Sequence, residues 1–234
     1  GAGQIQQIIA SETADFVRRY RSVDALPVEA VVRTAFNPNL NRAWFGAVNE
    51  VINQITMLAI ILTGAALIRE REHGTIEHLL VMPVTPFEIM VGKVWAMGLV
   101  VLAAAAFALR FVVEGWLDIP IQGSLLLFAS GAALHLFAAT SMGIFFGTVA
   151  RSMPQLGLLV ILTLIPLQIL SGGVTPRESM PALIQHIMLA APTTHFVELA
   201  QAILFRGAGV SVIWPQLLAL LAIGAVFFLG ALSR

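Results

Sequence analysis

Residues 69–93, REREHGTIEHLLVMPVTPFEIMVGK, form a dense polar block between two runs that are apolar enough to cross a bilayer. Hydrophobic residues make up 58% of the 234 residues and charged residues only 11%. Ordinary soluble domains have about 45–50% and about 25% of these two classes. The composition therefore predicts a membrane protein, and the polar block is a connection on one side of the membrane.

Five stretches of the chain approach the roughly 20 apolar residues that a helix needs to span the hydrocarbon layer. They cover residues 48–68, 94–113, 125–150, 156–171 and 212–232. The expected fold class is an all-α membrane protein with five transmembrane helices.

The Lys and Arg residues orient these spans, because cytoplasmic loops carry an excess of positive charge. If the C-terminus is inside, the inner segments hold more Lys and Arg than the outer loops. The inner set is Arg69, Arg71, Lys93, Arg151 and Arg234, and the outer set is Arg177 and Arg206. The polar block is therefore predicted to be cytoplasmic.

Residues 1–43 differ in kind from the transmembrane part, residues 44–234. They hold five Arg and four acidic residues, apolar residues at helical spacing between Ile5 and Tyr20, and a strand-like composition over 28–36. We expect the remnant of an extracytoplasmic α+β domain. Such a unit at the start of the chain, without a targeting segment, suggests a further transmembrane helix upstream, hence six in the parent protein.

The local signals inside the polar block favour a docking element. Thr75 is placed to cap a short helix with an apolar face, and Pro83 ends it. Thr85 and Glu88 then form a capping box, with Pro86 at the first position of the next helix, which runs into the second span. We interpret residues 69–85 as a cytoplasmic coupling segment for a partner. The alternative is a plain charged loop that only sets topology.

Residues 172–211 are too long for a turn and too apolar for a free loop. Thr175 and Pro176 begin a start signal, and residues 181–190 and 194–205 read as helices, closed by Pro192 and Gly207. Apolar helices this short are expected to be re-entrant or interfacial. We predict an outer re-entrant helical hairpin that acts as a lid on a conduit. A hairpin that only thickens the outer face is the alternative.

Polar residues inside the spans allow two interpretations. Asn49, Asn53, Thr56 and Thr63 share one face of the first span, where they could line a substrate path or join helices through hydrogen bonds. On the third span, small residues from Ala139 to Gly147 repeat at intervals of four and predict close helix packing. His135 on that span is interpreted as a structural histidine.

The sequence carries no motif for catalysis, cofactor binding or metal binding. Gly92-Lys93 lacks the first glycine and the hydroxyl residue of a phosphate-binding loop, and there is no HExxH or His/Cys cluster. Equal numbers of basic and acidic residues, 13 each, give no argument for nucleic acid. An intramembrane serine hydrolase that uses Ser171 with His195 or His186 is kept as the alternative function.

Taken together, these motifs resemble the ABC-2-type permeases, the membrane subunits of a class of ABC exporters. The resemblance rests on Glu70-Arg71-Glu72-x-Gly74-Thr75-x-Glu77-x-Leu79-Leu80-x-x-Pro83, on Phe36-Asn37-Pro38 and on Ser171-Gly172-Gly173 with the prolines and His195-Phe196 downstream. It is closest to a bacterial subgroup with a large extracytoplasmic insertion after the first transmembrane helix. We expect this chain to be the C-terminal part of such a permease, without that helix and most of the insertion.

The resemblance implies a permease subunit in the bacterial inner membrane that moves drug-like or lipid-like compounds outward. It would pair with a second permease copy or paralogue and with cytoplasmic ABC ATPase subunits, which would bind the ATP and Mg. Three sets of residues would carry these roles. The coupling set is Glu70, Arg71, Glu72, Gly74, Thr75, Glu77, Leu79, Leu80 and Pro83; the re-entrant gate set is Ser171, Gly172, Gly173, Pro176 and Pro181; the conduit set is Asn49, Asn53, Thr56, Thr163 and Gln168.

The predicted orientation can be tested with single cysteines, because the chain has none of its own. In intact cells, a membrane-impermeant thiol reagent should label Glu178→Cys, which is predicted outside, and spare His78→Cys, which is predicted inside. A permeant reagent should label both. The opposite pattern with the impermeant reagent would show that the orientation is inverted.

Overall fold

The computed structural model describes residues 11–12, 42–73, 83–117, 121–173 and 177–233. Contacts divide the chain into two units, Gly1–Asn41 and Arg42–Arg234, and the description below concerns the second. The predicted α+β remnant, the helix capped by Thr75 and the start signal at Pro176 lie outside the described residues. Within the described part of the second unit, every regular element is a helix.

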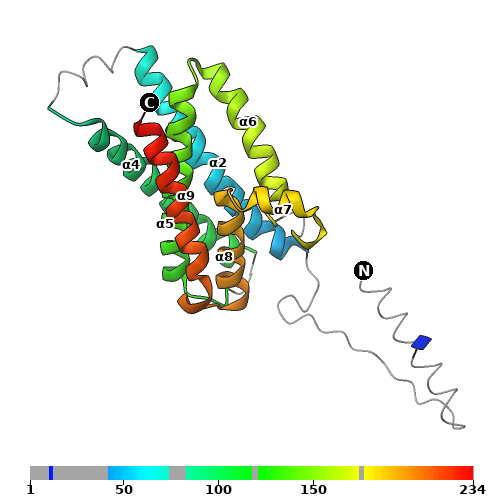
Figure 1. The fold of residues 1–234 in the computed structure, drawn as a ribbon. Helices are drawn as coiled ribbons and strands as arrows, with labels where there is room; N and C mark the ends of the chain where they lie inside the picture. Colours follow the sequence, from blue (N-terminus) through cyan, green and yellow to red (C-terminus); the bar gives the residue numbers. More distant parts are fainter. Residues whose placement is uncertain (1–10, 13–41, 74–82, 118–120, 174–176, 234) are drawn as a thin grey trace, which may run out of the picture. The chain divides into compact units, whose positions relative to one another are not determined.

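Among the described residues, five helices are long and apolar enough to cross a membrane, which confirms the five predicted spans. They are α2 (Arg42–Glu72), α4 (Pro86–Phe107) with its continuation η1 (Ala108–Glu114), α5 (Leu125–Val149), α6 (Met153–Leu170) and α9 (Val210–Leu232). Three shorter elements lie between α6 and α9: η2 (Arg177–Ser179), α7 (Ala182–Met188) and α8 (Pro192–Arg206). In Figure 1, α7 lies across the bundle and α8 runs from it to the end where α9 begins.

Helix α4 begins as the sequence predicts. The backbone N–H of Glu88 donates to Thr85 Oγ1 (3.3 Å), and the N–H of Thr85 donates to Glu88 Oε2 (2.7 Å). This reciprocal pair satisfies two donors that a helix start leaves free, and Pro86 occupies the first turn. The helix therefore begins well before the apolar run at residue 94, and the polar ends of α2 likewise extend beyond the predicted span.

The end of the second span differs from a simple α-helix. Residues Ala108–Glu114 form the π-helix η1, with Leu109 and Val113 buried. No local signal marks it, because the run ALRFVVE contains neither Pro nor Gly, and its two charged residues, Arg110 and Glu114, have the i,i+4 spacing of an ordinary α-helical ion pair. A π-turn holds one more residue per hydrogen-bonded ring than an α-turn, so the side chains after Phe107 point in directions that an α-helical pattern does not predict.

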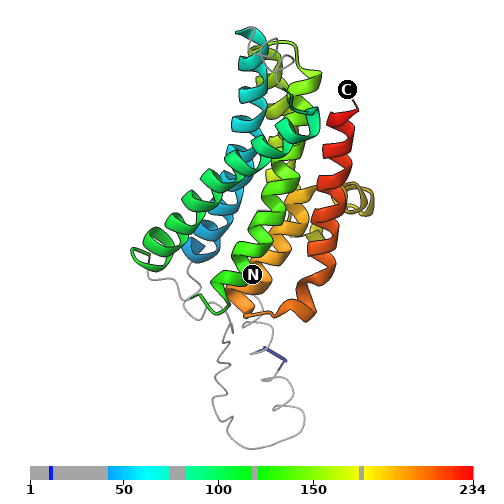
Figure 2. The same ribbon diagram turned by 90° about the vertical axis from the view of Figure 1, so that its left-hand side faces the viewer.

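Helix α5 is the centre of the bundle and packs against α2, α4, α8 and α9. Figure 2 shows it between the other long helices. A Cβ atom on Gly143 would lie 2.6 Å from the carbonyl oxygen of Ile60, and one on Gly64 would lie 3.0 Å from that of Gly143. On the side of α9, a Cβ on Gly224 would lie 2.6 Å from the Phe137 ring. The predicted small-residue packing of α5 is therefore present.

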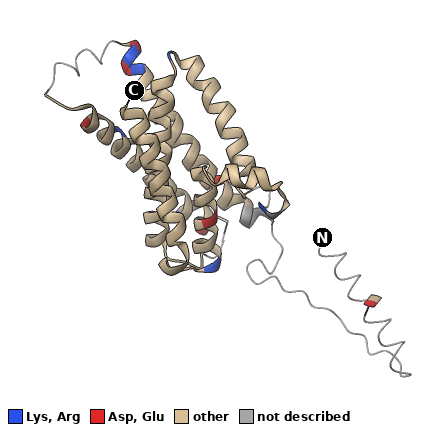
Figure 3. Cartoon of the chain, in the orientation of Figure 1, with Lys and Arg blue, Asp and Glu red and all other residues tan. Residues whose placement is uncertain are grey.

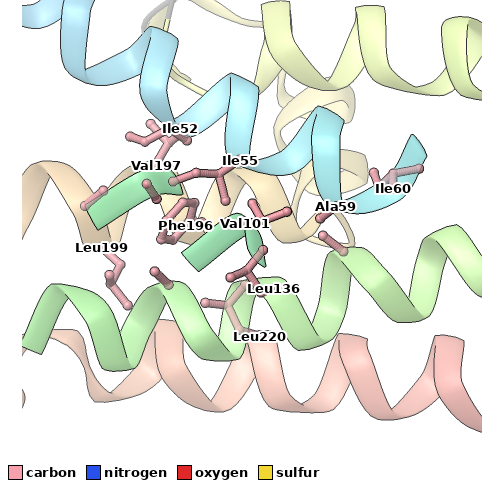
Figure 4. Close-up of a cluster of buried hydrophobic side chains, with 14 of the residues drawn as sticks. Ile52, Ile55, Ala59, Ile60, Val101, Leu136, Phe196, Val197, Leu199 and Leu220 are labelled. Carbon is pink, nitrogen blue, oxygen red and sulfur yellow. The ribbon is translucent and has the colours of Figure 1, made fainter. Parts of the chain in front are cut away.

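Side chains from five helices meet in the core next to α5. Figure 4 shows Ile52 of α2, Val101 of α4, Leu136 of α5, Phe196 of α8 and Leu220 of α9 converging there. Large apolar side chains also cover the outside: Trp95, Leu162 and Val226 are 65%, 64% and 70% exposed. Water would penalise such a surface, whereas lipid tails match it.

The close approach of α2 and α5 gives a matched pair of substitutions. Gly143→Ala should destabilise the bundle by about 1–3 kcal/mol, because the new Cβ meets backbone and α2 must shift. Gly98→Ala on α4, where nothing lies within 4 Å of the new Cβ, should leave stability unchanged or raise it slightly. Thermal unfolding of the two purified variants in detergent checks this, and equal melting temperatures would contradict the packing argument.

Candidate functional site

An ion pair joins α2 and α4 at the end of the bundle that carries the polar block. Lys93 Nζ donates to Glu70 Oε1, and the two side chains are only 12% and 27% exposed. Charged residues gather near the helix ends in Figure 3, and α5, α6 and α9 carry none. Glu70, which belongs to the predicted coupling set, thus has its ion-pair partner within the same chain.

The next residue, Arg71, joins α2 to the end of α5. Its Nη1 donates to the carbonyl oxygens of Gly147 (3.0 Å), Ala150 (3.4 Å) and Thr148 (3.5 Å). The last carbonyls of a helix have no partner within the helix and carry partial negative charge, so a guanidinium group there satisfies them. Glu70 and Arg71 together brace the end of α2 against its two neighbours.

The rest of the coupling set is free of such contacts or lies outside the described residues. Glu72 and Pro83 are exposed, and Glu72 has no ion-pair partner in the part of the chain that the structure describes. Five members fall in the segment that is not described: Gly74, Thr75, Glu77, Leu79 and Leu80. Docking of a partner through this set stays a prediction.

At the opposite end of α2, the side chain of Asn49 holds the predicted gate. Its Nδ2 donates to the carbonyl oxygen of Gly173 (2.7 Å), and its Oδ1 accepts from Nε2 of Gln201 on α8 (3.3 Å). The Ser171 hydroxyl donates to the Gln168 carbonyl (3.2 Å), and Gly172 has a φ of 95°. That φ favours glycine and turns the chain sharply after α6.

The gate region consists of a bent pair of helices. α7 and α8 meet at 89°, so they form either a broken span or a re-entrant loop. Pro181 precedes α7, and Pro192 is the first residue of α8, so the prediction that Pro192 closes a helix and that the next one begins at Thr194 was wrong by two residues. Proline suits a first helical position because its missing N–H has no partner there. Gly207, with a φ of 62°, ends α8 as predicted.

Two residues on the polar face of α2, Asn49 and Thr56, contact other parts of the bundle, whereas Thr63 donates to the Ala59 carbonyl of its own helix. Thr56 Oγ1 donates to the Ile52 carbonyl (3.0 Å) and lies 2.8 Å from Nε2 of His135, whose ring stacks on Phe196 of α8 at 4.1 Å. A proton on Nε2 satisfies both donors, while Nδ1 has no partner among the described residues. The other conduit candidates, Asn53, Thr163 and Gln168, are half-buried, and their role stays a prediction.

The described residues do not assemble a hydrolase site. Ser171 bonds to the Gln168 carbonyl, whereas His195 Nε2 lies 2.8 Å from the Leu189 carbonyl and His186 Nδ1 lies 2.6 Å from the Ala182 carbonyl. A nucleophilic serine needs a base within hydrogen-bond reach, and neither histidine bonds to Ser171. In this part of the chain there is also no group of three or more residues that could hold a metal ion.

Comparison with known proteins decides the family. Residues 6–205 match the family model described as ABC-2 type transporter. The chain belongs to the ABC-2 type transporter family. This membership makes it part of a membrane transport permease and not an enzyme in its own right. With its five apolar helices, it is a multi-pass protein of the inner membrane.

Named relatives agree with this family. The chain is 64% identical over all of its 234 residues to "Inner membrane transport permease YhhJ" of Escherichia coli (strain K12) and covers 63% of that protein. It is 31% identical over 226 residues to "Probable multidrug ABC transporter permease YbhR" of the same organism, with 94% of the chain and 61% of that protein covered. It is 22% identical over 221 residues to "ABC transporter G family member 20" of Dictyostelium discoideum, with 93% and 30% covered.

Sequence reasoning missed three partners within this ABC-2 permease. Lys93 stood in the polar block, but no local pattern pairs it with Glu70, which lies 23 positions away. Gln201 is an amide within an otherwise apolar stretch of α8, and that was a signal for a buried hydrogen bond. The stacking of His135 on Phe196 depends on the lateral placement of α8, which no local pattern predicts.

The ion pair between α2 and α4 can be tested by charge reversal. Glu70→Lys or Lys93→Glu alone should lower stability by about 1–3 kcal/mol, because each places two like charges in a partly buried site. The double variant restores opposite charges and should recover most of the loss. Melting temperatures of the permease in detergent give the readout, and a double variant no better than the worse single one would contradict the pair.

Proposed function

We propose that this chain is the main transmembrane part of a permease subunit of an ATP-driven exporter. The exporter would move hydrophobic or amphiphilic compounds out of the cytoplasm or the inner leaflet. Family membership and the relative named as a probable multidrug permease support this proposal. The single observation that carries it is the arrangement of α2, which has the polar block at one end and the bent pair α7–α8 bound at the other.

The energy source is proposed to be a separate subunit. The sequence lacks a phosphate-binding loop, and the family implies an ABC ATPase as partner and, typically, dimeric assembly. ATP and Mg would therefore be bound by the ATPase, and a second permease copy or paralogue would complete the membrane part. Residues 69–85 would be the docking segment, with the exposed carboxylate of Glu72 facing basic residues of the partner.

The braces at Glu70 and Arg71 give the docking segment a mechanical role. Because they tie the end of α2 to α4 and to the end of α5, a displacement of the segment moves three helices together. Packed helices shift as rigid elements between discrete arrangements and do not deform continuously. A conformational change of the ATPase that displaces residues 69–85 would thus move the helices of the whole bundle.

Grooves on the bundle support a hydrophobic or amphiphilic substrate. Three grooves of about 320, 390 and 450 Å³ border α4, and nearly all of their lining is apolar. Small-molecule sites are typically concave, apolar and about 300–1,000 Å³ in volume. The groove between α2 and η1 adds two polar side chains, Glu50 and Gln54, which hydrogen-bond to each other at 2.6 Å. An amphiphile matches such a lining better than a polar solute does.

The docking model predicts the effect of two substitutions in the full-length parent protein. Glu72→Lys places a positive charge against a basic partner surface, and Gly74→Pro alters the backbone of the docking segment. Both should abolish substrate-stimulated ATP hydrolysis and weaken co-purification of the ATPase, while the amount of protein in the membrane stays the same. These quantities are measured on the purified complex and in membrane fractions.

Glu12→Lys is the matched control, because it reverses an exposed carboxylate in the unit predicted to lie on the other side of the membrane. It should leave hydrolysis and co-purification unchanged. A normal complex with normal stimulation in both docking-segment variants would overturn the docking model.

A further inference from the structure

We propose that Asn49 is a positioning residue that fixes the bent pair α7–α8 to α2. The helix that ends in the coupling segment would then also set the position of the gate. This inference rests on the proposed function, and it adds the residue through which the two ends of the permease act on each other.

Both polar atoms of the buried Asn49 amide form hydrogen bonds, each with a different residue. The side chain is 9% exposed, its Nδ2 donates to the Gly173 carbonyl at 2.7 Å, and its Oδ1 accepts from Gln201 at 3.3 Å. A side-chain amide offers an N–H donor and a carbonyl acceptor on two separate atoms, so it can bind both partners at once. A carboxylate would turn an oxygen toward the Gly173 carbonyl, and an aliphatic side chain would leave Gly173 and Gln201 without partners in an apolar environment.

The groups tied by Asn49 belong to the whole gate region. Gly173 lies in the turn that leaves α6, and Gln201 lies in the middle of α8. Arg177 of η2 pairs with Glu198, one turn before Gln201, at 3.5 Å. Residues at spacing three share a helix face, so Glu198 and Gln201 bind η2 and α2 from the same side of α8. Asn49 therefore ties the turn after α6 and α8 to α2, and the Arg177–Glu198 pair ties η2 to α8.

Helix α2 has the rigidity that transmission requires. It runs without proline from Arg42 to Glu72, and at 1.5 Å per residue the distance from Asn49 to Arg71 is about 33 Å. Between these ends, Thr56 contacts His135, which stacks on Phe196 of α8. Two points on α8, Phe196 and Gln201, are therefore coupled to the helix whose other end is braced by Glu70 and Arg71.

If Asn49 only stabilised the fold, its substitution would have a different effect. Loss of a helix-joining hydrogen bond would lower the amount of folded complex, and ATP hydrolysis and transport would then fall in the same proportion. A positioning role separates the two activities, because the ATPase still docks and turns over while the gate no longer follows α2. The ratio of compound transported to ATP hydrolysed distinguishes these cases.

The experiment uses the full-length protein with its ATPase in proteoliposomes and rhodamine 6G as the transported amphiphile. Asn49→Leu and Asn49→Asp should keep ATP hydrolysis within about twofold and lower the dye transported per ATP about tenfold, the factor that corresponds to about 1.4 kcal/mol. Leu62→Ala, at an exposed position of α2 (37%) that belongs to none of the coupling, gate and conduit sets, is the control and should keep both. An unchanged ratio in both Asn49 variants would overturn the proposal.

A second measurement does not depend on transport. A spin label on Leu183→Cys, an exposed position of α7 (72%) in a chain without other cysteines, reports the mobility of the gate region. The label should be immobile in the parent and in the control Leu62→Ala, and more mobile in both Asn49 variants. Equal mobility in all four proteins would refute the tie. If dye transport by the unchanged protein proves independent of ATP, the proposed function fails, and the label still decides whether Asn49 holds the gate.

Discussion

The close approach of α2 and α5 is the contact on which the rest of the bundle depends. In lipid, no hydrophobic force draws apolar helices together, so packing and a few polar contacts must hold them. Gly64 and Gly143 let the two backbones come close enough for a Cβ on either residue to meet a carbonyl oxygen of the other helix. The remaining faces of α5 then receive α4, α8 and α9.

The polar contacts are arranged along the same pair of helices. Arg71 satisfies the last carbonyls of α5, Thr56 meets His135 in its middle, and Asn49 binds the turn after α6 and α8. Each contact uses a group that would be costly to bury alone. The helices are therefore held in one lateral and axial register, which apolar packing alone would specify only weakly.

Local sequence signals predicted the features that local physics controls. The five spans follow from length and apolar content, the start of α4 from Thr85 and Glu88, and the end of α8 from Gly207. The short helices α7 and α8 followed from apolar runs too brief to span. In each case, the residues that decide the structure lie within one or two helical turns of each other.

The sequence could not predict contacts that depend on which helix lies beside which. Nothing local pairs Glu70 with Lys93 or Asn49 with Gln201, because apolar helices of similar length could be arranged in many ways. The placement of neighbouring helices gives Asn49 and Thr56 partners across the bundle, while the role of this face in a conduit stays a prediction. The π-helix η1 also lacked a signal, since its seven residues include no Pro or Gly that would mark a change of helix geometry.

The central place of α5 has a consequence for biosynthesis. Chains are made from the N-terminus, so α2, α4 and α5 enter the membrane before α8 and α9 exist. During that interval α5 has its glycine contacts with α2, but His135 has no Phe196 to stack on and Phe137 has no Gly224 to pack against. The faces of α5 that pack on α8 and α9 thus stay exposed to lipid until the last helix is synthesised. A chain released before α9 would present that unfinished face to the proteases that remove incomplete membrane proteins.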